Sequence, residues 1–284
     1  MFTIKVEATS ANICVGFDVL GLSLDIYNEF TFELKNEFSF KGFDKQYSNI
    51  NNNLVYDAYK KVFDKVNVKP LPVEIGYKGD IPVSRGLGSS SSLIVAGVFA
   101  ANYFLNNKFS KDELFQICAD IEGHPDNVAP AIYGGLVASY KVNDIYKHIC
   151  YDVSKDLSFY VIIPPFKIST PDARKVLPTE LSYKDINNNL SRIVNIPYAF
   201  RNGDINLLKD LFNDKLHEPY RAKLIKGFDE IKAEALKNDS CLSISGSGST
   251  MLLITKDKKA IEKINTLGYK VLAVNVGTGV KVGE

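Results

Sequence analysis

The sequence predicts an α+β protein with two lobes. Its candidate strands and helices do not alternate strictly, as they would in a protein built from β-α-β units. The chain has 284 residues, of which 45% are hydrophobic and 24% charged, so it is long enough for a sizeable core and for two lobes. The apolar run FYVII at 159–163 opens a second group of elements. We therefore expect an N-terminal lobe at 1–155 and a C-terminal lobe at 156–284.

The N-terminal lobe is expected to begin with strands at 3–8 and 28–34, the second from its alternating apolar residues. Residues Asn53–Val66 predict a helix, because apolar side chains recur on one face. The segment from Ser89 to about Leu105 predicts another helix. This segment is apolar on nearly every side, so the helix should be buried on nearly every side.

A capping box at Ser110-Lys111-Asp112-Glu113 predicts the start of a third helix, which Gly123 and Pro125 end. A mixed stretch around 141–157 then separates the two lobes. The C-terminal lobe is expected to hold helices near 184–200, 204–212 and 219–237, and strands at 159–163, 241–245, 250–255 and 270–276.

Composition narrows the class of protein. The net charge of +1 gives no reason to expect nucleic acid as a partner. The cysteines at 14, 118, 150 and 241 form no C-x-x-C pair, which favours reduced thiols over a zinc site or a disulfide framework. No apolar stretch is long enough for a membrane span, and the charged first thirty residues do not resemble a signal peptide. We expect a soluble cytoplasmic protein.

The stretch PVSRGLGSSSS at 82–92 places glycines and serines directly before a buried helix. Glycine lets the main chain approach a ligand, and free N–H groups at a helix start favour an anion, so the stretch predicts a phosphate loop. An ordinary helix start remains an alternative, because Ser is a preferred N-cap. A Walker-type P-loop is excluded, since Ser89 and not Lys follows Gly88. A dinucleotide fingerprint is excluded because Ser91 stands where its third Gly would be.

The end of the capped helix carries two acids, Asp120 and Glu122, where the helix dipole favours cations. Asp120 is expected to face water. Glu122 precedes Gly-His-Pro-Asp-Asn, and a Mg²⁺ ion bound there would account for its charge, because this cation binds carboxylate and phosphate oxygens together. A phosphate loop with a Mg²⁺ carboxylate indicates phosphoryl transfer.

These stretches resemble the GHMP small-molecule kinases and, within them, the homoserine kinases. The matching blocks are ATSANICVGFDVLG at 8–21, PVSRGLGSSSS at 82–92, EGHPDNVAPAIYGG at 122–135 and SISGSGST at 243–250, with STPDAR at 169–174 and LHEPYR at 216–221. The resemblance implies a ribosomal-protein-S5-like N-terminal lobe and a ferredoxin-like α/β sandwich as the C-terminal lobe. It also implies ATP-dependent phosphorylation of the L-homoserine side-chain hydroxyl in threonine biosynthesis, and a homodimer.

The resemblance implies a substrate pocket of Asn12, Asp18, His124, Thr170, Arg174 and Arg221. Asp18 would hold the substrate ammonium or hydroxyl, and the two arginine forks would grip its carboxylate. Asp18, His124 and Asn127 are the expected catalytic residues. Many relatives have a general-base Asp at the position of Asn127. An amide cannot accept a proton, so the proton could pass to a phosphate oxygen or through Asp18.

The resemblance also implies ATP and Mg²⁺ as cofactors, with Ser90 and Glu122 as the metal ligands. The expected nucleotide-binding residues are Pro82, Arg85, Gly86, Leu87, Gly88, Ser89, Ser90, Ser91 and Ser92. Residues 53–55 suggest an adenine pocket only weakly. His217 is open between a site role and a helix cap, whereas His148, Arg192 and Arg201 are expected to be structural or surface residues.

The sequence departs from the family pattern at three places. Cys14-Val15 stands for Gly-Pro, Ser91-Ser92 for Ala, and Ser249 for Pro, while the glycines of each block are kept. These exchanges bear on local rigidity more than on activity. Two alternatives remain: a sister kinase acting on another small alcohol, such as mevalonate, and a catalytically silent nucleotide-binding regulator.

Overall fold

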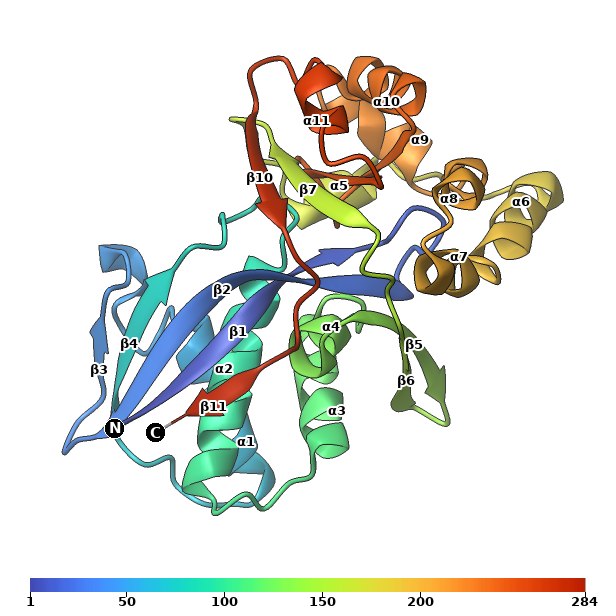
Figure 1. Ribbon diagram of the computed structural model, residues 1–284. Coiled ribbons are helices and arrows are strands. Elements are labelled where there is room, and N and C mark those ends of the chain that lie inside the picture. Colours follow the sequence, from blue (N-terminus) through green and yellow to red (C-terminus); the bar gives the residue numbers. More distant parts are fainter. Residues whose placement is uncertain (284) are drawn as a thin grey trace.

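The structure, a computed structural model, describes residues 1–283 and contains two sheets (Figure 1). The larger sheet has seven strands, in the order β11-β1-β2-β4-β3, with β5 paired to β2 and β6 to β5. Its strands are β1 (Phe2–Ala11), β2 (Leu20–Leu34), β3 (Ser39–Lys41), β4 (Val73–Gly79), β5 (Leu136–Val142), β6 (Ile145–Tyr151) and β11 (Lys281–Gly283). The smaller sheet has four antiparallel strands, in the order β10-β7-β9-β8. They are β7 (Ser158–Ile163), β8 (Ser240–Ile244), β9 (Met251–Thr255) and β10 (Lys270–Val274).

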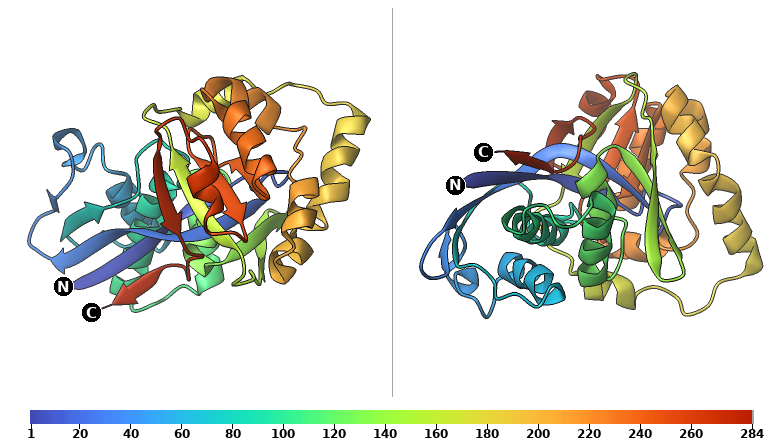
Figure 2. Two further views of the ribbon diagram at one scale, coloured as in Figure 1. Left: turned by 45° about the horizontal axis from the view of Figure 1, so that its top comes forward. Right: turned by 90° about the horizontal axis from the view of Figure 1, so that it is seen from below.

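Helices pack against one face of the larger sheet (Figures 1 and 2). They are α1 (Leu54–Lys65), α2 (Ser89–Phe104), α3 (Lys111–Glu122) and α4 (Val128–Tyr133). Their apolar side chains form one core with those of β1 and β2, including Phe30 and Phe32. Helix α2 is buried along most of its length, as its apolar sequence predicts. The capping box at Ser110 and the end at Gly123 are likewise confirmed for α3.

The smaller sheet has helices on both faces, and its two faces belong to different cores. One face packs against α10 (Phe228–Lys237) and α5 (Thr170–Lys175). The other face packs against α7 (Ile196–Asn202), α8 (Ile205–Leu211) and the first part of β2. The lobes are therefore joined by a shared apolar core. Four further short elements are η1 (Lys45–Tyr47), α9 (Glu218–Arg221), η2 (Ala222–Leu224) and α11 (Ala260–Lys263).

The α+β class is confirmed, but several elements differ from expectation. The helix expected at 184–200 is two helices, α6 (Tyr183–Ile193) and α7, because Pro197 has no N–H to continue the hydrogen-bond ladder. The helix expected at 219–237 is also broken, since Gly227 has a positive φ of 78° before α10. The hairpin of β5 and β6 was not expected. Its turn residues Asn143 and Asp144 have φ values of 48° and 64°.

The expected boundary at residue 155 falls between β6 and β7. Strand β11, from the end of the second segment, returns to the larger sheet beside β1, so this boundary stays a prediction. Within residues 1–283, no helix is both long and apolar enough to cross a membrane.

Candidate active site

A cavity of about 790 Å³ lies between the two lobes. The first lobe contributes the loop between β4 and α2, the end of α3 and the segment before β2. The second lobe contributes residues 167–171, Arg221 and the glycine-rich turn after β8. A concave site of this size with convergent polar groups is the usual form of a small-molecule site.

The loop at 82–92 is held by its carbonyl groups. The carbonyl oxygens of Arg85, Gly86 and Leu87 accept hydrogen bonds from Thr250 N (3.1 Å), Ser245 Oγ (2.6 Å) and Thr9 N (3.2 Å). The amides of residues 86–88 make no hydrogen bond to any part of the chain that the structure describes. They precede the sixteen-residue helix α2, whose N-cap is Gly88 at φ 68°. The loop can therefore offer free N–H groups to an anion.

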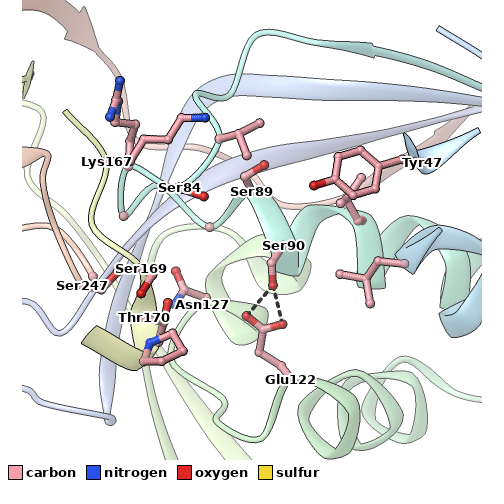
Figure 3. A pocket seen from close by; sticks show the side chains of 18 of the residues that line it. Tyr47, Ser84, Ser89, Ser90, Glu122, Asn127, Lys167, Ser169, Thr170 and Ser247 are labelled. Atoms are coloured by element: carbon pink, nitrogen blue, oxygen red, sulfur yellow. Dashed lines mark hydrogen bonds between the residues drawn. The ribbon is translucent and has the colours of Figure 1, made fainter. Parts of the chain in front are cut away.

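Glu122, the last residue of α3, lies beside Ser90 at the start of α2 (Figure 3). Its carboxylate accepts from Ser90 Oγ at 2.9 and 3.1 Å and from Ser91 Oγ at 2.8 Å. Glu122 forms no ion pair within residues 1–283, and the last turn of α3 contains no basic residue. No basic side chain there therefore compensates its charge at the helix C-terminus. Asp120 accepts instead from Gln116 Nε2 at 2.8 Å.

The Ser90 and Glu122 pair fits one hard cation. Hydroxyl and carboxylate oxygens are ligands that Mg²⁺ accepts, and this ion commonly takes one or two carboxylates and completes its shell with phosphates and water. Among residues 1–283, no group of three or more His, Cys, Asp or Glu side chains is arranged to hold a metal by itself. Such an ion would therefore depend on oxygen ligands from the substrate and solvent.

The segment before β2 has an unusual backbone. Asn12, Cys14 and Asp18 have positive φ values of 58°, 46° and 55°, which non-glycine residues rarely adopt. The Asn12 side chain holds this shape, since its Oδ1 accepts from Asp18 N at 2.8 Å and its Nδ2 donates to Gly246 O at 3.1 Å. The sequence block 8–21 is thus folded onto the glycine-rich block 243–250.

Asp18 and Arg174 face each other across the lobes. The guanidinium donates to both carboxylate oxygens, at 2.9 and 3.2 Å, and each side chain is more than one-third exposed. The two residues expected to bind opposite ends of a zwitterion therefore bind each other in this structure.

Arg221 lies beneath them and is 2% exposed. Its Nε donates to Ala173 O at 3.2 Å and its Nη1 to Gly246 O at 3.0 Å. Burial and the nearby charge of Arg174 lower the pKa of Arg221 to about 10, so the side chain stays charged at neutral pH. The Phe17 ring lies 5.0 Å from this guanidinium and 5.7 Å from that of Arg174.

His124 and Asn127 lie on the loop between α3 and α4. His124 Nδ1 is 2.8 Å from the carboxylate of buried Asp126, and this hydrogen bond raises the pKa of His124 despite partial burial. Asn127 Oδ1 accepts from Thr9 Oγ1 at 2.8 Å. The amide oxygen of Asn127 is therefore already engaged with the first strand.

Most of the expected site residues line the cavity together. They are Asn12, Asp18, Arg85, Gly86, Gly88, Ser89, Ser90, Glu122, His124, Asn127, Thr170, Arg174 and Arg221. Pro82, Leu87, Ser91 and Ser92 do not line it. Leu87 packs in the core between the lobes, and Ser92 Oγ accepts from Asn28 Nδ2 at 2.8 Å. These side chains shape the loop from behind.

Residues 53–55 line the far end of the cavity with Phe43, Tyr47 and Tyr77. Asn53 also caps α1, since its Oδ1 accepts from Tyr56 N at 3.0 Å. No sequence pattern predicted Tyr47 as a site residue, because the short helix η1 that carries it has no periodicity. Lys167 was not predicted either. It lies two residues before the block STPDAR at 169–174.

His217, whose role the sequence left open, is buried and makes structural contacts. It stands at the N-cap of α9, but its side chain does not cap the helix. Its Nε2 donates to Cys14 O at 2.7 Å, and its ring stacks on Phe17 with centroids 5.3 Å apart. His217 therefore supports the strained segment at 12–18 from below. His148 stacks on Tyr133 away from the cavity, as a structural residue would.

Comparison with known proteins gives matches in both lobes. Residues 53–135 match the GHMP kinases N terminal domain, and residues 198–266 match the GHMP kinases C terminal family. A homoserine kinase of Clostridium beijerinckii is 44% identical over 263 residues, which cover 91% of this chain and 87% of the relative. One from Clostridium botulinum is 43% identical over 260 residues, with the same two shares covered.

The fold is also that of a solved structure. The homoserine kinase of Cytophaga hutchinsonii superposes with a TM-score of 0.88 at 28% sequence identity, over 99% of this chain and 96% of that one. The superposition therefore includes both sheets.

Proposed function

This chain belongs to the GHMP kinase family and, within it, to the homoserine kinases, and from this premise we propose that it transfers the γ-phosphoryl group of ATP to the side-chain hydroxyl of L-homoserine. The product is O-phospho-L-homoserine, an intermediate of threonine biosynthesis. One observation carries the proposal for the site: a single cavity gathers the phosphate loop, Glu122, the segment at 12–18 and two arginines from distant parts of the chain.

ATP would lie along the length of the cavity. Its phosphates would accept hydrogen bonds from the free amides of residues 86–90, at the positive end of the α2 dipole. Its adenine would lie near Tyr47 and residues 53–55, at the far end of the cavity. Ser90 and Glu122 would hold Mg²⁺, which when bound neutralises the developing phosphate charge.

L-homoserine would replace the ion pair of Asp18 and Arg174. Its ammonium would pair with Asp18 and its carboxylate with Arg174 and Arg221, so that each charge regains a partner of opposite sign. His124 and Thr170 would add hydrogen bonds at the same end. A substrate with only one of the two charges would leave one member of the pair unpaired.

Positioning and charge stabilisation would supply most of the rate. The homoserine hydroxyl oxygen forms a bond to the γ-phosphorus while the bond from that phosphorus to the β-phosphate oxygen breaks, and ADP leaves. The proton released from the hydroxyl would pass to a phosphate oxygen or to Asp18. Asn127 would orient groups and not accept the proton, because its amide has no basic atom and its oxygen accepts from Thr9.

The first experiment is steady-state ADP production from ATP and Mg²⁺ with L-homoserine, L-serine, L-threonine or mevalonate. We expect turnover with L-homoserine alone, and at least a tenfold loss of kcat/KM in Arg221→Lys, because Lys cannot form the buried fork (about 1.5–3 kcal/mol for a charged hydrogen bond). Arg201→Lys, at an exposed ion pair on α7, is the matched control and should be unchanged.

Other outcomes separate the alternatives. Turnover with mevalonate and not with L-homoserine would identify a sister kinase. Calorimetric ATP binding without turnover of any alcohol would favour the silent regulator. Asp18→Asn tests the proton path, since a variant that keeps full kcat would exclude Asp18 as the acceptor.

Two further expectations remain proposals. We propose that the enzyme is a homodimer and that it acts in the cytoplasm, the latter because its cysteines form no disulfide within residues 1–283. Sedimentation of the full chain tests the first, and fractionation of the source cells tests the second.

A further inference from the structure

The phosphate loop carries no lysine, whereas the Walker-type P-loop holds one that reaches the β- and γ-phosphates, and protein kinases supply one from a neighbouring strand. Its one cationic side chain is Arg85, whose Nη2 donates to Pro165 O at 2.9 Å, in the other lobe. Apart from the proposed Mg²⁺, only backbone amides of this loop would stabilise a highly charged triphosphate.

Four cationic side chains line the cavity: Arg85, Lys167, Arg174 and Arg221. Arg174 pairs with Asp18, and Arg221 donates to main-chain carbonyls beneath the acceptor end. Lys167 differs from them. Its ammonium group forms no ion pair and no hydrogen bond with any residue in 1–283, and the side chain is exposed to the cavity.

The backbone around Lys167 is fixed on both sides. Pro165 O accepts from Arg85, and Phe166 O accepts from Ser249 Oγ at 2.5 Å. Ile168 is buried in the core of the second lobe. A free lysine side chain thus stands on an anchored segment, and Figure 3 shows it at the end of the cavity where Ser84 and Ser89 of the loop lie. One anchor of this segment is therefore the phosphate loop, through Arg85, and the other two lie in the second lobe.

We propose that Lys167 binds the terminal phosphates of the nucleotide and supplies, from the second lobe, the charge that the phosphate loop lacks. This inference rests on the proposed function. Lysine suits the role because its ammonium is a compact charge on a flexible stem that can follow a phosphate group as charge moves in the reaction.

The proposal gives Arg85 a different role from Lys167, although both side chains line the cavity. The contact of Arg85 with Pro165 O ties the loop to the segment that carries Lys167, so the loop and the lysine keep one relative position. Arg85 would then act as a positioning residue, and Lys167 would touch the nucleotide.

The test compares Lys167→Gln, Lys167→Arg and a matched control, Lys175→Gln. Lys175 lies eight residues further along, on α5, in an exposed ion pair with Asp172 and outside the cavity. Steady-state kinetics would be measured with ATP and L-homoserine, and ATP and AMP binding by calorimetry. We expect Lys167→Gln to lower kcat/KM for ATP by about 10- to 100-fold, with ATP affinity falling more than AMP affinity and with KM for L-homoserine nearly unchanged. Lys167→Arg should recover most of the loss, and Lys175→Gln should behave as the wild type.

Equal kinetics for Lys167→Gln and Lys175→Gln would overturn the proposal, as would equal losses of ATP and AMP affinity. A wild-type protein without turnover would refute the proposed function and not this inference, because ATP binding by the same variants still decides the role of Lys167. Thermal unfolding of both Lys167 variants should match the wild type, since the ammonium group makes no ion pair or hydrogen bond within residues 1–283 that its removal would break. Lys175→Gln should also change stability little, because its ion pair with Asp172 is exposed.

Discussion

A Cβ atom at position 86 would lie 2.1 Å from the carbonyl oxygen of Ser245. Gly86 also has φ 75°, so any other residue would be strained even without this contact. The same glycine that frees the loop for a phosphate therefore lets it dock against the glycine-rich turn of the second lobe. Gly123 has φ 87° but open space around it, which separates the two effects.

We predict that Gly86→Ala destabilises the protein and disrupts ATP binding, whereas Gly123→Ala has only the backbone effect. The second change should lower the unfolding free energy by about 1–2 kcal/mol. The first should exceed it, because Ser245 or the loop must move as well. Urea unfolding and KM for ATP measure both. Equal unfolding free energies and equal KM values for the two variants would contradict this account of the loop.

The hydrogen bond from His124 to Asp126 predicts a pH dependence. It raises the pKa of His124, so the charged imidazole stabilises the folded state fully below about 6.5, the usual histidine value, and this contribution is lost as pH rises through the higher folded value. NMR titration should find a midpoint above that of unfolded histidine, and Asp126→Asn should lower it. A midpoint unchanged by Asp126→Asn would show that Glu122 or Asp18 causes the shift.

The site residues that sequence could predict are those within recognisable blocks. The glycines and Ser90 follow from the needs of a phosphate loop, and Glu122 from its unfavourable place at a helix end. Lys167 could not be found this way, since a single exposed lysine has no spacing pattern. The pairing of Asp18 with Arg174 also escapes sequence, because the two residues come together only when the lobes pack.

At the level of elements, prediction succeeded where one local signal was strong. The capping box set the start of α3, and continuous apolarity set α2. Strand β2 was expected only at 28–34, because its first part is buried on both faces and shows no alternation. The prediction of continuous helices at 184–200 and 219–237 was wrong. The helical pattern of apolar residues continues past Pro197 and Gly227, but the backbone helix does not.

Helices α9 and α10 are linked by an ion pair between buried Glu218 and partly buried Lys232. Glu218 is 3% exposed and also accepts from Ile244 N at 3.2 Å, so it connects these helices to β8. Removal of one partner would leave a buried charge without compensation. The pair therefore holds Arg221, which follows Glu218 on the same short helix, in place under the cavity.

We predict that Lys232→Met lowers the unfolding free energy by about 3–5 kcal/mol. The double variant Lys232→Met with Glu218→Gln should regain part of that loss, because Gln keeps an acceptor for Ile244 N without the charge. Lys237→Met is the control on the same helix, at an exposed pair with Glu234, and should change stability by less than about 1 kcal/mol. A double variant no more stable than Lys232→Met would argue against an uncompensated charge.

In the whole molecule, the cavity lies where the lobes share a core. Leu22 of β2 and Leu252 of β9 belong to the same apolar cluster, so the lobes cannot separate without exposing it. Contacts of Arg85, Asp18 and Asn12 with the second lobe cross the same junction. The two lobes should therefore unfold together. The sequence predicted two lobes but no contacts between them, so this cooperativity could not be predicted from it.

Strand β11 pairs with β1, and Gly283 lies opposite Thr3, so the two ends of the described chain are neighbours (Figure 1). A short peptide could therefore join the two ends and make the backbone continuous between them. A short linker between these ends, with a new opening at the exposed turn of Asn143 and Asp144, would give a circular permutant whose sheets and cavity are unchanged. We predict that it folds and keeps its kcat with ATP and L-homoserine, measured beside the original chain. A permutant that folds but is inactive would mean that the β5–β6 turn has a role in catalysis. An active permutant would show that activity does not depend on the order of the two lobes along the chain.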